Sequence, residues 1–292
     1  MIHVERLLRV AHAVHDRAAA QRLYEDVFGA KLFHSGPLEA EGRDGCLLLI
    51  SNLCIDLASA ERDEGVGRFL AERGEGFCSV LFRVADLDEA QRHLGECGVR
   101  VARRTPSLLA VAPEDTLGVQ FELTDRDLPG DPRLDGRWSG AYWRDEHPAG
   151  ILGFWAVTTL APDVAAAREL YARVFGAELV SARPGVVASR EVNFLALGRG
   201  VIGIMEPRAS PSDLTKVVAR QGTEGIHAVS GQLKSVPDAV RYFRSKGIGL
   251  VGSGEYYVMP HPRMCFGARF MMGRGPEPGD PMWELRRRFM GA

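Results

Sequence analysis

A repeated segment divides this chain of 292 residues into two halves. The stretch AQRLYEDVFGAKLF at positions 20–33 returns as ARELYARVFGAELV at positions 167–180, an offset of 147 residues. Eight of the fourteen positions are identical, so chance is a poor explanation. An internal repeat indicates that one structural unit is present more than once. The second half is therefore expected to adopt the fold of the first.

Each copy of the repeat has the pattern of a helix that follows a strand. Apolar stretches, LLRVAHAV and GFWAVTTL, precede the two copies. Asp16 and Asp163 stand just before the helices, where an acidic side chain can accept hydrogen bonds from the first free backbone N–H groups. Gly29 and Gly176 follow, where a left-handed residue commonly ends a helix. The repeat thus predicts two strand–helix units of the same design.

A second strand–helix unit follows in each half. Residues 80–101 match residues 228–251 in pattern, and short strands accompany every helix. The chain is therefore predicted to be an α+β protein of four β-α-β-β-β units, paired into two domains with cupped sheets. Residues 125–150, rich in Gly, Pro and Asp, are predicted to link a first domain (1–124) to a second (151–292). The tryptophans of this linker could still pack against a domain face.

Composition narrows the classes of partner. A net charge of −2 gives no broad basic surface, so nucleic acid is not expected to bind. No apolar stretch approaches the roughly eighteen residues of a membrane span, and MIHVERLLRV has no signal-peptide pattern. Five cysteines without a C-x-x-C pair favour free thiols in a reducing compartment, so we expect a cytoplasmic protein. Motifs of serine hydrolases, P-loops and dinucleotide sites do not occur in the sequence.

Four β-α-β-β-β units in a chain of this length resemble the vicinal oxygen chelate superfamily, which includes glyoxalases, bleomycin-resistance proteins, extradiol dioxygenases and methylmalonyl-CoA epimerases. In the first half, GRFLAERGEGFCSVLFRVADLDEA and VAPEDTLGVQFELTD resemble the epimerase-like members most. The resemblance implies cupped sheets whose first and last strands carry His, Glu or Gln ligands to one divalent metal. The metal would chelate two adjacent oxygens of a substrate.

The ligand positions that the resemblance implies for the first half fall on Arg9, Asp56, Ser79 and Glu122. The two carboxylates are present, but an arginine and a serine stand where histidines are expected. One hypothesis is a metal-free site in which Arg9 binds an anion, a carboxylate acts as general base and Ser79 adds a hydroxyl. The alternative is that Arg9 only pairs with Asp56 or Glu122 as a structural salt bridge.

In the second half the first-strand position falls on Ala156 or a neighbour, which offers no ligand. His227 in GIHAV and Glu284 in MWELRRR, the segment predicted to be the last strand of the second half, form the better candidate metal pair. A catalytic metal usually has three protein ligands, so a third would come from His261, from Glu206 or from the substrate. The alternative is a polar pair hydrogen-bonded across the sheet. The cofactor expected is thus one divalent metal in the second domain, or none.

The remaining candidates are substrate-binding residues of the second half and core residues of the first. Tyr256 and Tyr257 fit a strand that lines the second pocket, with one ring inward and the other outward, and His261 lies close by as a further substrate-binding candidate. His12 shares its strand face with apolar residues, which favours a hydrogen-bonded core histidine. Cys78 is interpreted as a small core residue.

Three functions follow from these patterns and the resemblance. The leading hypothesis is an enzyme that transfers a proton next to a carbonyl of a small oxygen-bearing molecule, as an isomerase or lyase. The alternative is a protein of the bleomycin-resistance type, which sequesters a small ligand without chemistry. Extradiol ring cleavage is less favoured, because it needs an inward histidine near Ala156. One half could serve as a scaffold, and pairing of two chains into a homodimer is left open.

Overall fold

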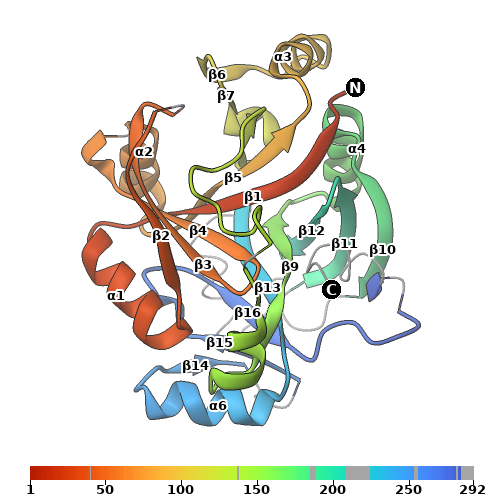
Figure 1. The fold of residues 1–292 in the computed structure, drawn as a ribbon. Helices are drawn as coiled ribbons and strands as arrows, with labels where there is room; N and C mark the ends of the chain where they lie inside the picture. The colour runs from red at the N-terminus through yellow and green to blue at the C-terminus, as the bar shows by residue number, and fades with distance from the viewer. Residues whose placement is uncertain are drawn as a thin grey trace.

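The computed structural model describes residues 1–39, 41–62, 64–136, 138–184, 189–207, 224–252, 256–280 and 282–283. They form two eight-stranded sheets with the same strand order, β2-β3-β4-β1-β5-β8-β7-β6 in the first and β10-β11-β12-β9-β13-β16-β15-β14 in the second. Figure 1 shows α3 beside β6 and β7 at one end of the molecule, and α6 beside β14 and β15 at the other. The predicted α+β fold with paired β-α-β-β-β units is confirmed.

The strands of the first sheet are β1 (Val4–Ala13), β2 (Lys31–Leu38), β3 (Arg43–Ile50), β4 (Leu53–Ala58), β5 (Gly76–Val84), β6 (Val101–Thr105), β7 (Leu108–Val111) and β8 (Gln120–Thr124). Those of the second are β9 (Ile151–Leu160), β10 (Glu178–Pro184), β11 (Ser189–Leu197), β12 (Gly200–Pro207), β13 (Gly225–Leu233), β14 (Leu250–Val251), β15 (Tyr257–Pro260) and β16 (Phe270–Gly273).

The helices are α1 (Arg17–Phe28), α2 (Glu64–Arg73), α3 (Leu87–Glu96), α4 (Val164–Phe175) and α6 (Val236–Ser245), with short helical turns η1 (Ala60–Arg62), η2 (Pro113–Thr116), η3 (Tyr142–Glu146) and η4 (Pro262–Met264). The repeated helices α1 and α4 begin and end as predicted. The carboxylate of Asp16 accepts a hydrogen bond of 2.8 Å from the Ala19 amide, and that of Asp163 one of 2.9 Å from the Ala166 amide. Gly29 and Gly176 end these helices in the left-handed conformation.

One apolar core joins the two halves. Phe28, at the end of α1, packs against Phe270 of the second sheet with ring centroids 4.9 Å apart. Phe175, at the end of α4, packs against Phe121 of the first sheet at 4.4 Å. Each repeated helix therefore contributes its last aromatic residue to the sheet of the other half.

Two turns dock reciprocally between the halves. The turn Leu117–Gly118 lies against the start of β13, and a Cβ on Gly118 would be 3.2 Å from the backbone nitrogen of Gly225. The turn Phe266–Gly267 lies against the start of β5, and a Cβ on Gly267 would be 1.8 Å from the carbonyl oxygen of Glu75. Leu117 and Phe266 both have positive φ angles, of 57° and 50°. The two halves thus use the same backbone geometry to contact each other.

The segment predicted as a linker packs closely against the first half. Leu128 and Trp138 join an apolar cluster with residues of β1, β3 and β5. Arg133 donates hydrogen bonds of 2.9 Å to the carbonyl of Leu8 and 3.1 Å to that of Asn52. The indole of Trp143 is almost fully buried and donates a bond of 2.9 Å to a backbone carbonyl of α1. The expectation that tryptophans of this segment pack on a domain is confirmed.

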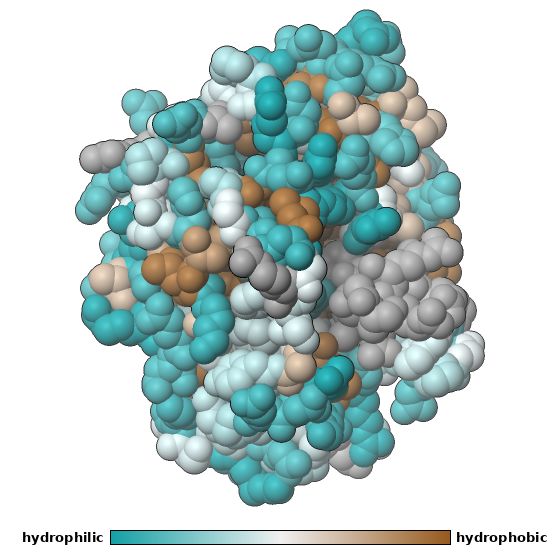
Figure 2. Space-filling view, viewed as in Figure 1, coloured by the Kyte–Doolittle hydropathy of each residue, from teal (hydrophilic) through white to brown (hydrophobic). Residues whose placement is uncertain are grey.

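No helix in the described part of the chain is both long and apolar enough to cross a bilayer. Figure 2 shows hydrophilic side chains over most of the face in view, with hydrophobic ones in small scattered groups.

Candidate functional site

Arg9 lies at the centre of the inner face of the first sheet, and its side chain is completely buried. Its guanidinium donates to both carboxylate oxygens of Glu41, with one distance of 2.8 Å, and to Glu122 at 2.8 Å. Its Nε lies 3.2 Å from the carboxylate of Asp56. We call this inner face, which carries Arg9, Ala11 and Ala13 on β1, the first cup.

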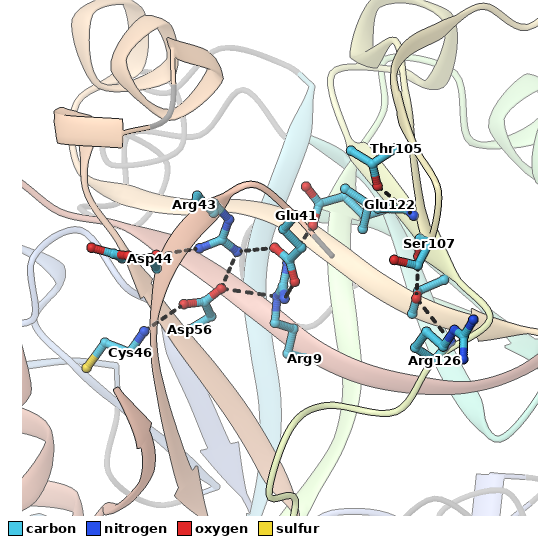
Figure 3. Close-up of polar contacts among 12 residues, drawn as sticks. Arg9, Glu41, Arg43, Asp44, Cys46, Asp56, Thr105, Ser107, Glu122 and Arg126 are labelled. Atoms are coloured by element: carbon cyan, nitrogen blue, oxygen red, sulfur yellow. Dashed lines mark hydrogen bonds and ion pairs between the residues drawn. The ribbon is translucent and has the colours of Figure 1, made fainter. Parts of the chain in front are cut away.

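Two further arginines complete an ionic cluster. Arg43 on β3 lies 2.7 Å from Glu41 and also donates to Asp56. Arg103 on β6 lies 3.4 Å from Glu122. Figure 3 shows the side chains of Arg9, Glu41, Arg43 and Asp56 pointing toward one another. Three guanidinium groups and three carboxylates thus neutralise one another inside the first cup.

The pKa values of the carboxyls follow from this arrangement. Burial by itself raises the pKa of Glu41 and of Asp56, but Arg9 and Arg43 outweigh it, so both pKa values lie below the usual range. Burial also raises the pKa of Glu122, and there the arginines do not compensate fully. The carboxylates of Glu41 and Asp56 are therefore held ionised and paired, which leaves neither as a free base.

The structure brings together three of the four residues that the sequence suggested for this site. Arg9, Asp56 and Glu122 meet as predicted, and Arg9 pairs with both carboxylates. Ser79 is buried on β5 opposite Ala11, and no hydrogen bond joins it to the cluster among the described residues. Sequence reasoning missed Glu41, Arg43 and Arg103. Glu41 follows β2 in the connection to β3, where no strand or helix periodicity marks an inward side chain.

The rest of the first cup is largely filled. On one side of the cluster, Val66 and Leu70 of α2 pack onto the small residues of β1 and β4. A cavity of about 380 Å³ lies beside Glu41 and Leu81, with Leu128 also in its lining. The first cup therefore offers a modest apolar cavity next to a neutralised ionic cluster.

The second cup is the equivalent face of the second sheet, which carries Ala156, Thr158 and Leu160 on β9. Strand pairing gives the equivalent positions. In the first sheet, Leu81 of β5 lies opposite both Arg9 of β1 and Glu122 of β8. In the second sheet, Ser230 of β13 holds the position that Leu81 has in the first. The residues that correspond to Arg9, Asp56 and Glu122 are Ala156, Gly203 and Met271. Uncharged residues thus replace these three charged side chains of the first cup.

The predicted last strand of the second half was misplaced. The sequence suggested MWELRRR at 282–288, but β16 (Phe270–Gly273) pairs in parallel with β13 and takes this role. Met282 is fully buried against Ala156 and Val201. Glu284, the predicted metal ligand, lies outside the described residues. The actual strand, FMMG, is short and uniformly apolar, so no alternation marks it in the sequence.

His227 is buried in the second cup with no hydrogen-bond partner for either ring nitrogen among the described residues. It occupies a bulge in β13, equivalent to the bulge at Cys78 in β5, where the thiol packs with Ala11. Burial, and then the charge of nearby Arg269, lower the pKa of His227 to about 3. Its imidazole is therefore neutral at physiological pH, and its hydrogen-bonding capacity is unused.

Trp155 occupies a second bulge, in β9, and its indole Nε1 is also buried without a hydrogen-bond partner in the described part of the chain. Its ring packs against Phe194 at 5.2 Å between centroids. The hydroxyls of Thr158 and Ser230 lie 3.3 Å apart on the same face. The second cup thus combines apolar walls with polar atoms that lack protein partners.

The three substrate-binding candidates near the second cup lie in different environments. Tyr257 is partly buried and shares its strand face with Met259, which packs against Leu160. Tyr256 is 63% exposed, so Tyr257 carries the inward ring. His261 is partly exposed, and its Nδ1 accepts a hydrogen bond of 3.2 Å from a backbone amide of η4. No bond joins it to His227 among the described residues.

The metal that the resemblance implies does not fit the described residues. They contain no group of three or more His, Cys, Asp or Glu side chains arranged to hold a metal ion. In the first cup, the guanidinium of Arg9 occupies the space between the carboxylates that a cation would need. In the second half, the described candidates His227, His261 and Glu206 do not come together as such a group.

The two ordinary interpretations hold. His12 is fully buried and bonded at both ring nitrogens, to the Phe266 carbonyl at 2.7 Å and the Tyr24 hydroxyl at 2.8 Å. Cys78 is a buried free thiol. Both predictions of core residues are confirmed.

Comparisons with known proteins agree with this architecture. The family model described as Glyoxalase/Bleomycin resistance protein/Dioxygenase superfamily matches residues 9–110. A mutant of 4-hydroxymandelate synthase from Streptomyces coelicolor is similar over 100% of this chain and 98% of that one, with a TM-score of 0.69 and 14% identity. The Mn(II)-bound glyoxalase from Novosphingobium aromaticivorans is similar over 93% of this chain and 83% of that one, with a TM-score of 0.58 and 16% identity.

Methylmalonyl-CoA epimerase from Mycobacterium tuberculosis is 31% identical, over 45% of this chain and 91% of that one, with a TM-score of 0.36. No curated protein sequence matches the chain. The structural similarity along the whole chain shows the fold, and the family model identifies the first half. The chain therefore belongs to the glyoxalase/bleomycin resistance/dioxygenase superfamily, the vicinal oxygen chelate fold.

Proposed function

We propose that this protein binds a small oxygen-bearing organic molecule in the second cup, and that the first cup is mainly structural. The observation that carries the proposal is the buried imidazole of His227, whose two nitrogens have no hydrogen-bond partner among the described residues. Leaving a buried polar group unpaired costs about 1–3 kcal/mol. A ligand that supplies hydrogen-bonding atoms would recover this energy on binding.

The other side chains of the second half that lie on or near the second cup indicate the chemical class of the ligand. The indole N–H of Trp155 is a second unpaired donor, and Arg269 adds positive charge beside the imidazole. Phe194 and Met271 provide apolar surface. Donors beside a positive charge favour carbonyl or carboxylate oxygens, and the apolar walls favour a hydrocarbon or aromatic body. The ligand class is therefore an apolar molecule with a carboxylate or carbonyl group.

Binding without chemistry is favoured over proton transfer in this cup. A general base works best when its pKa lies near the operating pH, and the pKa of His227 is about 3. Such a weak base removes a proton from carbon poorly. The sequestering role therefore takes precedence over the isomerase or lyase role that the sequence favoured.

A proton-transfer enzyme is the second candidate, and one observation supports it. Burial raises the pKa of Glu122, which makes this carboxylate a better base than Glu41 or Asp56. The hydrogen bond that Glu122 accepts from Arg9 would have to break before this carboxylate could take a proton from a substrate. This role belongs to the first cup, so the two candidates can be separated by mutation.

The test is a binding screen with matched variants. Aromatic carboxylates, 2-oxo acids and acyl thioesters are screened by thermal shift, and those that bind are measured by calorimetry. We expect His227→Ala to weaken binding at least tenfold and Trp155→Phe to weaken it less. The control is Cys78→Ala, at the equivalent bulge of the first cup, which should bind as the wild type does. Mass spectrometry of the incubated ligand should show no product.

Two outcomes would contradict the proposal. Binding that survives His227→Ala but is lost in Leu81→Trp, which fills the cavity of the first cup, would move the site there. Product formation that is abolished by Glu122→Gln would replace sequestration by catalysis.

A further inference from the structure

A second cavity, of about 490 Å³, lies between the two halves beside the first cup, with Arg9 in its wall. Its walls come from the start of β1, the turn between β3 and β4, the segment before η3, and two residues of the second half, Leu152 and Arg199. A cavity of this volume is in the range that holds small organic ligands. The function proposed above makes no use of it.

The charged side chains that line the cavity all have the same sign. Five arginines line the cavity and no aspartate or glutamate does. The arginines are Arg6, Arg9, Arg133, Arg144 and Arg199. A concave surface lined by charges of one sign concentrates ions of the other sign. The lining therefore offers guanidinium donors and no carboxylate to a ligand.

Two of the five arginines are already engaged by the protein. Arg9 is bound by three carboxylates, as described above. Arg133 donates through its Nε and both terminal nitrogens, to Asp131 and to the carbonyls of Asn52 and Leu8. These two guanidinium groups have few N–H donors left for a ligand, so they line the cavity without binding its contents.

The other three arginines have donors to spare. Arg6 uses one terminal nitrogen, at 2.6 Å from Asp127, and Arg144 pairs with its exposed neighbour Asp145. Exposed pairs of this kind contribute little and exchange readily with a competing anion. Among the described residues no carboxylate pairs with Arg199, whose side chain is exposed. Three guanidinium groups can thus face a ligand at the mouth of the cavity.

The position of Arg199 is set by the contact between the halves. Its backbone amide donates a hydrogen bond of 2.7 Å to the carbonyl of Glu5 on β1. Gly198 has a φ of +56°, and a Cβ there would lie 2.4 Å from the carbonyl oxygen of Val4. Only glycine allows the turn to approach β1 so closely. The turn between β11 and β12 is therefore fixed where it presents Arg199 to the cavity.

We propose that this cavity binds a phosphorylated organic molecule. Guanidinium groups bind phosphate oxygens through paired hydrogen bonds, and a phosphate dianion suits three arginines better than a single carboxylate does. Leu7, Leu53 and Trp138 provide apolar surface for the organic part. Because Arg6 belongs to the first half and Arg199 to the second, the bound phosphate bridges the two halves.

The experiment compares three probes by calorimetry at low ionic strength. They are inorganic phosphate, phenyl phosphate and benzoate. We expect phenyl phosphate to bind at least tenfold tighter than either of the others, because it alone has both the dianion and the apolar group. Arg199→Ala should weaken the binding of phenyl phosphate at least tenfold, and Arg199→Lys should weaken this binding less. Arg168→Ala, on α4 and outside the lining of the cavity, is the control and should bind as the wild type does.

Other results would overturn the proposal. It fails if none of the probes binds, if inorganic phosphate binds as tightly as phenyl phosphate, or if Arg199→Ala binds phenyl phosphate as the wild type does. Thermal unfolding of each variant checks that the fold is intact. His227→Ala should bind phenyl phosphate normally, so this site and the second cup are tested separately.

Discussion

His12 on the first strand donates a hydrogen bond of 2.7 Å from Nε2 to the carbonyl of Phe266, in the other half of the chain. Its Nδ1 accepts a bond of 2.8 Å from the Tyr24 hydroxyl. Both nitrogens are used by a neutral imidazole, because one donates and the other accepts. Burial lowers the pKa of His12 from 6.5 to about 4, although the bond to Phe266 opposes the shift. The contact between the halves therefore depends on a histidine that has to stay uncharged.

Acid should weaken the fold through His12. Between pH 6.5 and about 4 the unfolded chain binds a proton here and the folded chain does not, so stability falls as the pH falls. The shift corresponds to about 3 kcal/mol over this window. In His12→Gln, the free energy of unfolding should change less with pH than in the wild type, as urea titrations at several pH values would show. Exposed His3→Gln is the control, and an unchanged slope in His12→Gln would contradict the prediction.

Removing Arg9 should destabilise the protein strongly. Arg9→Met leaves Glu41, Asp56 and Glu122 buried without their shared partner, and breaking a buried ion pair in this way costs about 3–5 kcal/mol. Adding Glu122→Gln to Arg9→Met should recover part of the loss, because it removes one uncompensated charge. Arg100→Met, which breaks an exposed pair with Asp115, should leave the denaturation midpoint nearly unchanged. Equal midpoints for Arg9→Met and Arg100→Met would show that the cluster contributes nothing.

Arg9→Ala should also create an affinity for divalent cations. The variant retains three carboxylates around a space that a guanidinium filled, and Mn²⁺ prefers oxygen ligands of this kind. We expect Mn²⁺ to raise the melting temperature of Arg9→Ala more than that of the wild type, and elemental analysis to find more Mn²⁺ retained after dialysis. Arg9→Ala/Glu122→Gln should retain less. If Arg9→Ala and the wild type respond alike, the arginine does not occupy a cation's place.

The docking turns should tolerate no side chain. Gly267→Ala puts a Cβ against the backbone of Glu75, so the turn would have to move away from the first half. Gly247→Ala has a similar positive φ, of +73°, with nothing within 4 Å of the new Cβ. It should therefore show only the backbone strain, which is about 1–2 kcal/mol. Thermal unfolding should rank Gly267→Ala clearly below Gly247→Ala, and the reverse order would rule out a tight contact at this turn.

Local patterns predicted the fold well, because caps and repeats act over a few residues. Asp16 and Gly29 bound α1 as expected, and the family resemblance brought Arg9, Asp56 and Glu122 to one site. The bulges at Trp155 and His227 could not be predicted, since one extra residue reverses the faces that simple alternation assigns. Glu41 was missed for another reason. It reaches the cluster from a connection between strands, and only the folded chain places it beside Arg9.

The reciprocal docking of Leu117–Gly118 and Phe266–Gly267 has the form of an isologous subunit interface, in which the same patch is used twice. Two copies of one ancestral gene, joined end to end, would inherit such an interface from a homodimer. Fusion would then have let the copies diverge, since assembly no longer required identical partners. One copy now carries a charge cluster where the other has alanine, glycine and methionine. On this view, duplication preserved the contact between the two halves and allowed the two cups to evolve separately.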